Sequence, residues 1–189
     1  MADALSRSIL GCPDGIAEER RWYALYTKPR HEKVVKKVLD EKGIENFLPL
    51  KRVVSRWADR KVELLVPVFP SYLFARYSTI KDHYKVVTTS GLVKVVATSQ
   101  APVAIPDDEI TSLILLFNCN HEFQPHEYLS VGQRVCITSG PLSGIRGILV
   151  STKSKSRVVL SVELIQRSIA VEVDQLDVDL LDGQKSQFV

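Results

Sequence analysis

A cluster of glycine and proline residues in the C-terminal third of the chain constrains the fold more than any other feature. It separates a run of alternating apolar and polar residues at 134–138 from an apolar run that begins at Ile148. The residues of this loop that shape it are Gly140, Pro141, Gly144 and Gly147. Their spacing excludes a helix and suits a tight turn, because proline fixes its own φ while glycine adopts positive φ or lets another backbone approach. The segment therefore predicts a strand–turn–strand unit in a small β-domain.

The composition is that of an ordinary globular protein. The 189 residues are 45% hydrophobic and 25% charged, with a formal net charge of +3, which allows one or two small domains. So small an excess of positive charge does not by itself indicate a nucleic-acid partner. Three scattered cysteines, none in a C-x-x-C pair, argue against a disulfide framework and a zinc site. With no long apolar run and no signal-peptide pattern, the sequence predicts a reduced, cytoplasmic protein that binds no membrane, and we expect a monomer.

Periodicity divides the chain into two domains. Residues 1–20 show little periodicity and are broken by glycine and proline, which predicts a mobile N-terminal extension. Residues 21–118 carry strand-like and helical patterns, so we expect an α/β domain there. Periodicity stops over 119–130, the expected linker, and short strands with turn signals over 131–183 predict a small β-barrel. The fold class is therefore α+β, an α/β sandwich followed by a barrel.

Apolar spacing also predicts the elements of the first domain. Pro29 is well placed to open the first helix, whose apolar stripe reaches Leu39 and which Gly43 ends. Acidic residues open a later helix at Asp107, where they face the positive end of the helix dipole. We expect strands over residues 22–27, 47–54, 61–66, 71–77 and 92–97. The second and third of these form a hairpin with a polar tip.

Three motifs occur in an order that resembles the NusG family. The first is the strand 22–26 followed by residues 28–34, and the second is Phe69-Pro70-Ser71-Tyr72, which leads into a strand. The glycine and proline loop is the third, and it resembles a KOW motif. The resemblance covers nearly all of the chain in which we expect order. It implies an NGN-type α/β domain joined by a linker to a small SH3-like β-barrel, the KOW domain.

Two departures from the family pattern favour a specialised paralogue. Ser71 stands where general NusG factors have glycine, and residues 165–170 read Ile-Gln-Arg-Ser-Ile-Ala where they have Phe-Gly-Arg-x-Thr-Pro. At the first of these positions the chain is more similar to RfaH and the UpxY-type antiterminators. The resemblance therefore implies an operon-specific antiterminator that binds RNA polymerase and suppresses pausing or termination. The missing aromatic residue puts in doubt any contact with termination factor Rho that depends on it.

The resemblance also implies a polymerase-binding patch on the strands of the first domain. Strand alternation places Tyr72 and Phe74 on the same face. The residues implied in docking on the clamp helices of the polymerase are Tyr26, Phe69, Pro70, Tyr72 and Phe74. Such a patch buries aromatic anchors in an apolar interface. The alternative is that these aromatic side chains belong to the ordinary core.

Cations gather at the first helix and at the expected hairpin, where Trp57 lies near the tip. Cationic side chains beside an aromatic ring are typical of sites that bind a single strand without reading its sequence. The resemblance places the first helix near the single-stranded non-template DNA. The candidate nucleic-acid-binding residues are Lys28, Arg30, His31, Lys33, Lys37, Arg56, Arg60 and Lys61. A solvated amphipathic face is the alternative, and it is the commoner origin of such a pattern.

Ile165 stands where the family has an aromatic residue, and it is the candidate contact of the KOW domain with ribosomal protein S10. A position in the ordinary core of the barrel explains this residue equally well.

No nucleophile elbow, metal-binding spacing or phosphate-cradling loop is present in the sequence. We therefore expect neither an enzyme nor a bound cofactor or metal.

Three rival functions stay open at this point. A general NusG factor, coupling to Rho or to the ribosome, would have the opposite effect on termination. A ribosomal-type protein would bind RNA through its KOW domain alone, which leaves the aromatic patch unexplained. A scaffold would be indifferent to both polymerase and DNA.

Overall fold

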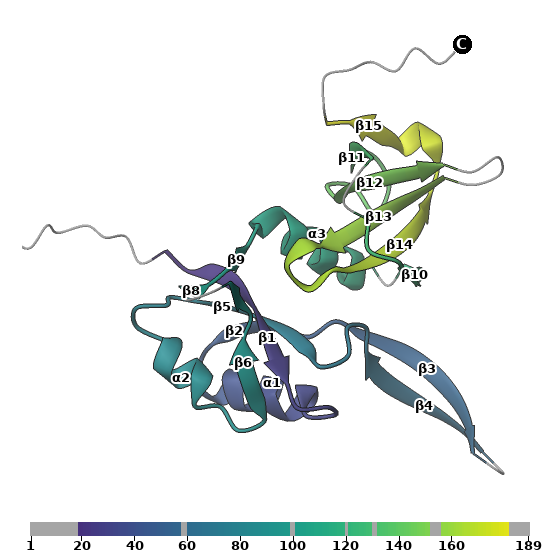
Figure 1. Ribbon diagram of the computed structural model, residues 1–189. Coiled ribbons are helices and arrows are strands. Elements are labelled where there is room, and N and C mark those ends of the chain that lie inside the picture. The colour runs from purple at the N-terminus through teal and green to yellow at the C-terminus, as the bar shows by residue number, and fades with distance from the viewer. Residues whose placement is uncertain are drawn as a thin grey trace, which may run out of the picture.

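The computed structural model describes residues 19–57, 60–98, 101–119, 121–129, 132–151 and 156–181. Nearly all of the extension expected over residues 1–20 lies outside these ranges. Two domains lie side by side, with helix α3 (Asp107–Asn118) between them (Figure 1). The mixed helix and strand content that the sequence predicts is confirmed.

The N-terminal domain is built on an antiparallel sheet. Its strand order is β2-β5-β1-β6, and the short strand β9 also pairs with β1. The strands are β1 (Arg21–Thr27), β2 (Glu45–Phe47), β5 (Tyr72–Tyr77), β6 (Leu92–Val95) and β9 (Ala104–Ile105). A separate small ribbon joins β7 (Ala97–Thr98) to β8 (Ala101–Pro102). Because side chains alternate along each strand, the central sheet has two apolar faces to cover.

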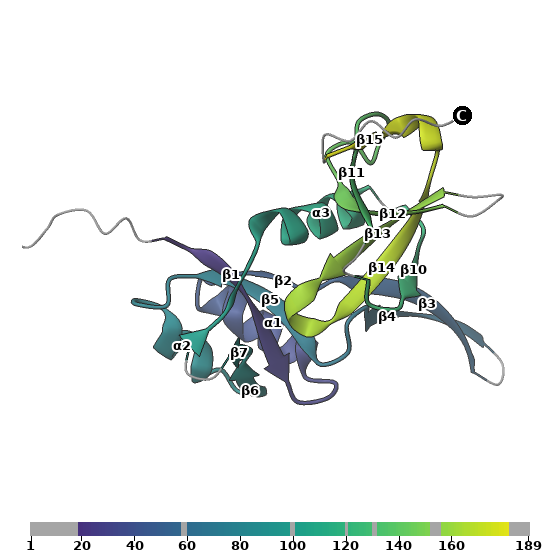
Figure 2. The same ribbon diagram turned by 45° about the horizontal axis from the view of Figure 1, so that its top comes forward.

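Helices cover both faces of this sheet (Figure 2). Helices α1 (Glu32–Glu41) and α2 (His83–Val87) lie on one face, where Leu25 of β1 and Leu39 of α1 belong to one buried cluster. Helix α3 lies on the other face, where its apolar side chains share a cluster with Trp22 of β1. The sheet face toward α3 is the one that carries the aromatic residues of the implied polymerase patch.

Helix α1 begins later than the sequence predicts. The expected start at Pro29 is wrong, because Arg30 has a φ of 63°, which a right-handed helix excludes, and the helix begins at Glu32. Its end agrees with the expectation. Gly43 has a φ of 69°, and its N–H donates to the carbonyl of Asp40 at 3.0 Å, as in a Schellman motif.

The predicted hairpin is present and longer than expected. Strands β3 (Leu50–Trp57) and β4 (Arg60–Pro67) pair with each other and with no other described strand. The ribbon projects away from the central sheet (Figure 1). Its apolar side chains Val54 and Leu65 are exposed. A two-stranded ribbon is marginal in stability by itself. A partner that covers the exposed apolar side chains of this ribbon would therefore stabilise it.

The C-terminal domain is a six-stranded antiparallel sheet with the order β10-β14-β13-β12-β11-β15. Its strands are β10 (Phe123–His126), β11 (Gln133–Ile137), β12 (Arg146–Ser151), β13 (Ser156–Val162), β14 (Arg167–Val173) and β15 (Val178–Leu180). Two 3-10 turns, η1 (Glu163–Ile165) and η2 (Gln175–Asp177), interrupt the strands. Within the described residues no pairing joins β10 to β15, so the barrel expected from the sequence is not closed.

Part of the segment expected as a linker is a strand. β10 pairs with β14 along its whole length, and Pro125 lies in this edge strand, where a missing N–H is tolerated. The Phe123 ring lies 4.9 Å from the ring of Phe117 at the end of α3. Proline and histidine are not typical strand residues, so the sequence did not predict this strand. Because the strand takes up part of the expected linker, the connection to α3 is shorter than expected.

The glycine and proline loop joins β11 to β12. Gly140 and Gly144 have φ angles of 74° and 91°. Gly147 lies in β12, and a Cβ there would be 2.6 Å from the carbonyl oxygen of Val159 in β13. Only glycine therefore allows β12 and β13 to approach this closely. Pro141 turns its carbonyl toward α3, where the thiol of Cys119 donates to it.

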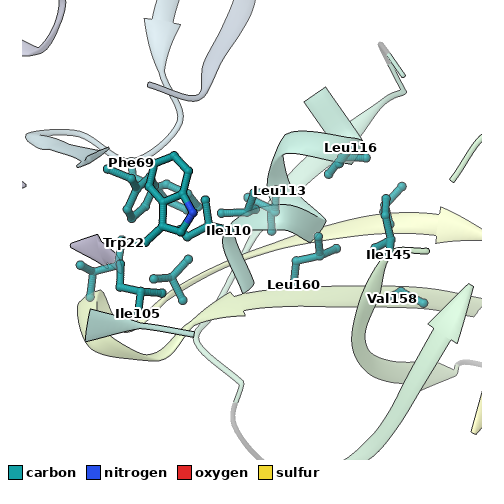
Figure 3. Packing of buried hydrophobic residues seen from close by; sticks show 14 of the residues in the cluster. Trp22, Phe69, Ile105, Ile110, Leu113, Leu116, Ile145, Val158 and Leu160 are labelled. Atoms are coloured by element: carbon teal, nitrogen blue, oxygen red, sulfur yellow. The ribbon is translucent and has the colours of Figure 1, made fainter. Parts of the chain in front are cut away.

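A single buried cluster, here called the interdomain cluster, runs from the N-terminal sheet through α3 into the C-terminal sheet. Figure 3 shows Trp22 and Phe69 on one side of Ile110 and Leu113, with Leu160 on the other. Among the described residues, two side chains within α3 accept hydrogen bonds from backbone N–H groups of the C-terminal domain. The Ser112 hydroxyl accepts the N–H of Arg146 at 3.0 Å, and the Glu109 carboxylate accepts the N–H of Glu163 at 3.3 Å. The C-terminal domain is therefore docked on α3.

Candidate functional site

Two half-exposed tyrosines form the accessible part of the implied polymerase patch. Tyr26 and Tyr72 are paired in the register of β1 and β5, and their ring centroids lie 5.3 Å apart. Pro70, at the turn before β5, is exposed beside them. Two rings at the end of the central strands β1 and β5, with a proline in the turn before β5, make a firm apolar surface, because few rotamers have to be fixed when a partner binds.

The turn that presents this surface depends on Ser71. Its N–H donates to a carboxylate oxygen of the buried Glu32 at 2.8 Å, and its carbonyl accepts the N–H of Thr27 at 2.9 Å. Its φ is 65°, a value that glycine adopts more readily than serine. The hydrogen bond between Glu32 and Ser71 thus joins the start of α1 to the turn that follows the Phe-Pro motif.

Phe69 and Phe74, the other two members of the patch, lie beneath the surface. Their side chains are 2% and 0% exposed, and their ring centroids are 6.1 Å apart in an edge-to-face arrangement. Phe74 also stacks on Phe47 at 6.3 Å. The structure therefore brings all the predicted patch residues together, but in the docked arrangement it exposes only Tyr26, Pro70 and Tyr72.

The cations predicted around the first helix are accessible. Lys28, Arg30, His31 and Lys33 are exposed, and the ammonium of Lys37 lies 3.9 Å from the carboxylate of Glu41. Within the described part of the chain, Lys28, Arg30 and Lys33 have no carboxylate partner. Unpaired cations at one end of a helix can follow a phosphate backbone.

The second group of predicted cations is at the far end of the hairpin. The backbone register pairs Arg56 with Lys61 and Trp57 with Arg60, so these residues share the tip of the ribbon. Their side chains lie outside the part of the chain that the structure describes. The hairpin and the start of α1 meet at Pro67 and Pro29, which line one surface cavity of about 420 Å³.

Ile165 lies in η1, is 8% exposed and belongs to the interdomain cluster. Phe69, from the implied polymerase patch, belongs to the same cluster. Both of these predicted binding residues are therefore buried in the docked arrangement.

Sequence reasoning missed the polar residues that hold the domains together. Glu109 of α3 is half-buried where the helix contacts the C-terminal domain, and burial raises its pKa to about 7. The N–H of Glu163 works against this shift by donating to the carboxylate, while the negative charges of Asp108 and Glu163 add to it. In the sequence Glu109 reads only as a favourable charge in a first helical turn, and nothing in its pattern signals the domain contact.

Neither a metal centre nor a membrane span is found where the structure can be described. No group of three or more His, Cys, Asp or Glu side chains comes together among the described residues. No described helix is long and apolar enough to cross a bilayer.

Comparison with known proteins gives one family match and several structural likenesses. Residues 20–114 match the NusG family, described as transcription termination factor nusG. A structure of Thermotoga maritima NusG, described as showing domain interaction, is 19% identical with a TM-score of 0.50, and the alignment covers 87% of this chain and 98% of that one. The MjSpt4:Spt5 complex has a TM-score of 0.30 at 17% identity, with 85% of this chain and 97% of that chain covered. The first likeness supports the fold, and the family match covers half of the sequence: this chain belongs to the NusG family.

Proposed function

We propose that this protein is a transcription elongation factor that binds the clamp of RNA polymerase through its N-terminal domain and suppresses pausing or termination. The observation that carries the proposal is the paired, half-exposed Tyr26 and Tyr72 beside Pro70, in a chain of the NusG family. A ligand that binds the closed clamp better than the open one shifts the polymerase toward the closed state by its difference in affinity. The proposed action is mechanical, and it takes place in the cytoplasm.

The exposed cations at the start of α1 would contact single-stranded non-template DNA, and the cations at the hairpin tip would extend that contact. The C-terminal domain would bind a second partner, ribosomal protein S10, through Ile165. Because Ile165 is buried in the interdomain cluster, this step requires the domains to separate. A tethered domain then searches for its partner at a raised effective concentration.

Operon-specific antitermination is the finer part of the proposal, and Ser71 and Ile165 support it because both depart from the pattern of general NusG factors. The second candidate is a general factor that supports termination. The description of the matching family as a termination factor favours this candidate.

Transcription in vitro separates these functions. The template carries a pause site and a terminator, and purified cognate polymerase is used with the wild-type protein or with Tyr26→Ala/Tyr72→Ala. We expect the wild type to increase readthrough and the double variant to lose this effect. Leu176→Ala is the control, because Leu176 is 91% exposed in the C-terminal domain, away from the patch. Increased termination would favour the general factor, and equal activity of wild type and double variant would contradict the proposed patch.

A further inference from the structure

A cavity of about 970 Å³ opens between the two domains. Neither the tyrosine pair nor residues 28–33 line it, although Leu65 lines both this cavity and the smaller one at the start of α1. One wall is the base of the β3–β4 hairpin, and the opposite wall is formed by β13 and β14. The end of α3 and the start of β10 close it at the back. We call it the interdomain cleft. It exists only because the domains are docked, and its lining comes from segments that are distant in the sequence.

Positive charge dominates the hairpin wall of the interdomain cleft. Lys51 and Arg52 line it, and neither has a carboxylate partner among the described residues. On the opposite wall the Arg157 guanidinium is 3.2 Å from Glu172, which neutralises it. Glu122 at the back of the cleft is the other acidic residue of the lining. The unpaired cations are therefore concentrated on one side, as they are in grooves that follow a phosphate backbone.

Aromatic rings lie at the back of the same cleft. Phe117 and Phe123 are both half-buried and stand 4.9 Å apart between ring centroids. Phe117 rests in turn on Phe47 at 5.8 Å, which fixes its position. The ammonium of Lys51 lies 5.7 Å from the centre of the Phe123 ring. If the Lys51 ammonium moves from this ring to a phosphate, the face of Phe123 that it leaves can stack a base.

We propose that the interdomain cleft binds single-stranded nucleic acid, with Lys51 and Arg52 on phosphates and Phe123 against a base. DNA and RNA share the chemistry that this arrangement recognises, a phosphodiester backbone with unpaired bases. The site is distinct from the α1 cations and does not require polymerase, so it can be tested on the purified protein, and its failure would leave the proposed polymerase contact untouched.

The first test is fluorescence anisotropy with single-stranded oligonucleotides of one mixed sequence, in a DNA arm and an RNA arm. We expect Lys51→Glu/Arg52→Glu to weaken binding at least tenfold. The slope of log K against log salt should fall by about 1.4, since each lost phosphate contact on a single strand removes about 0.7. The control is Lys81→Glu/Lys94→Glu, which makes the same change in net charge at exposed positions outside the lining. Equal losses in the two double variants would overturn the proposal, because binding would then follow net charge alone.

The second test addresses the ring and the location. Phe123→Leu keeps an apolar side chain but removes the stacking face, and we expect binding to weaken on the order of tenfold with an unchanged salt slope. Photocrosslinking from a halogenated pyrimidine should label the hairpin base or residues 121–124. Crosslinks confined to α1, or no binding of either oligonucleotide at low salt, would contradict the proposal. Tighter binding in one arm identifies the strand that the cleft prefers, and circular dichroism checks that each variant is folded.

Discussion

At the scale of single residues, Ser71 and Glu109 hold positions that a typical residue of their type avoids. Ser71 has a φ of 65° and contributes both backbone groups to hydrogen bonds that fix the turn before β5. Glu109 places a carboxylate between two packed domains, where its loss of water raises its pKa to about 7. The left-handed backbone of Ser71 costs free energy at the tyrosine pair, and desolvation of the Glu109 carboxylate costs free energy at the domain contact.

Replacing Ser71 with glycine should stabilise the protein. A left-handed backbone costs a residue with a Cβ about 1–2 kcal/mol, and the greater freedom of glycine in the unfolded chain cancels part of the gain. We expect Ser71→Gly to raise the free energy of unfolding in urea by up to about 1 kcal/mol. Ser90→Gly, at a position without positive φ, should lower it. A loss of stability in Ser71→Gly would show that the serine is not strained.

Docking of the C-terminal domain should weaken as the pH rises. The pKa of Glu109 is raised by burial from its usual value to about 7 in the docked state, so the docked state holds its proton more tightly than the separated state. The stabilising effect of that proton is full below the usual carboxyl pKa and is lost as the pH rises through about 7. We expect hydrogen exchange of the Glu163 amide, whose N–H donates to Glu109, to be better protected at pH 5 than at pH 8 after correction for intrinsic rates.

Glu109→Gln tests the same point without a change of pH. The amide oxygen can still accept the N–H of Glu163 but carries no charge to desolvate. The variant should therefore stay docked at pH 8 and lose the pH dependence. Glu127→Gln, at an exposed position, should keep it. A Glu109→Gln variant that remains pH-dependent would assign the effect to another group.

At the scale of elements, α3 belongs to both domains. Its apolar side chains Ile110, Leu113 and Leu116 pack in a cluster that includes Trp22 of the N-terminal sheet and Leu160 of the C-terminal sheet. Its polar side chains bond to backbone of the C-terminal domain. A helix shared in this way couples the stability of one domain to the other.

Leu113→Ala should expose that coupling. Truncating a fully buried leucine costs about 2–5 kcal/mol, and Leu113 is 0% exposed. We expect hydrogen exchange to increase in strands of both domains. Leu39→Ala, equally buried but in the cluster on the other face of the N-terminal sheet, should affect only the N-terminal domain. Increased exchange in the N-terminal domain alone after Leu113→Ala would contradict a shared role for α3.

At the scale of the whole molecule, docking decides which surfaces are available. The tyrosine pair and the α1 cations remain accessible, whereas Phe69 and Ile165 are buried members of the interdomain cluster. The interdomain cleft exists only in this arrangement. A partner that binds Ile165 would therefore dismantle the cleft, and binding at the two sites should be mutually exclusive.

Local patterns in the sequence predicted most elements, because strand alternation, Gly43 and the glycine and proline loop act over a few residues. The start of α1 could not be predicted, since Arg30 adopts a positive φ that its side chain does not signal. Strand β10 was missed because Pro125 hides its alternation and β14 supplies its pairing. The domain contact was missed because the stripe on α3 looks the same whether it covers one sheet or two. The family resemblance placed Tyr26 and Tyr72 in one patch, but their pairing could be seen only from the register of β1 and β5.

The most direct test of the account is equilibrium binding of the full-length protein to purified core RNA polymerase, wild type against Tyr26→Ala/Tyr72→Ala. Truncating an interface residue that carries binding energy costs more than about 1 kcal/mol. We therefore expect the double variant to bind at least tenfold more weakly while its urea midpoint stays close to that of the wild type. Unchanged affinity in a folded double variant would show that polymerase does not bind at this patch, and it would contradict the central claim.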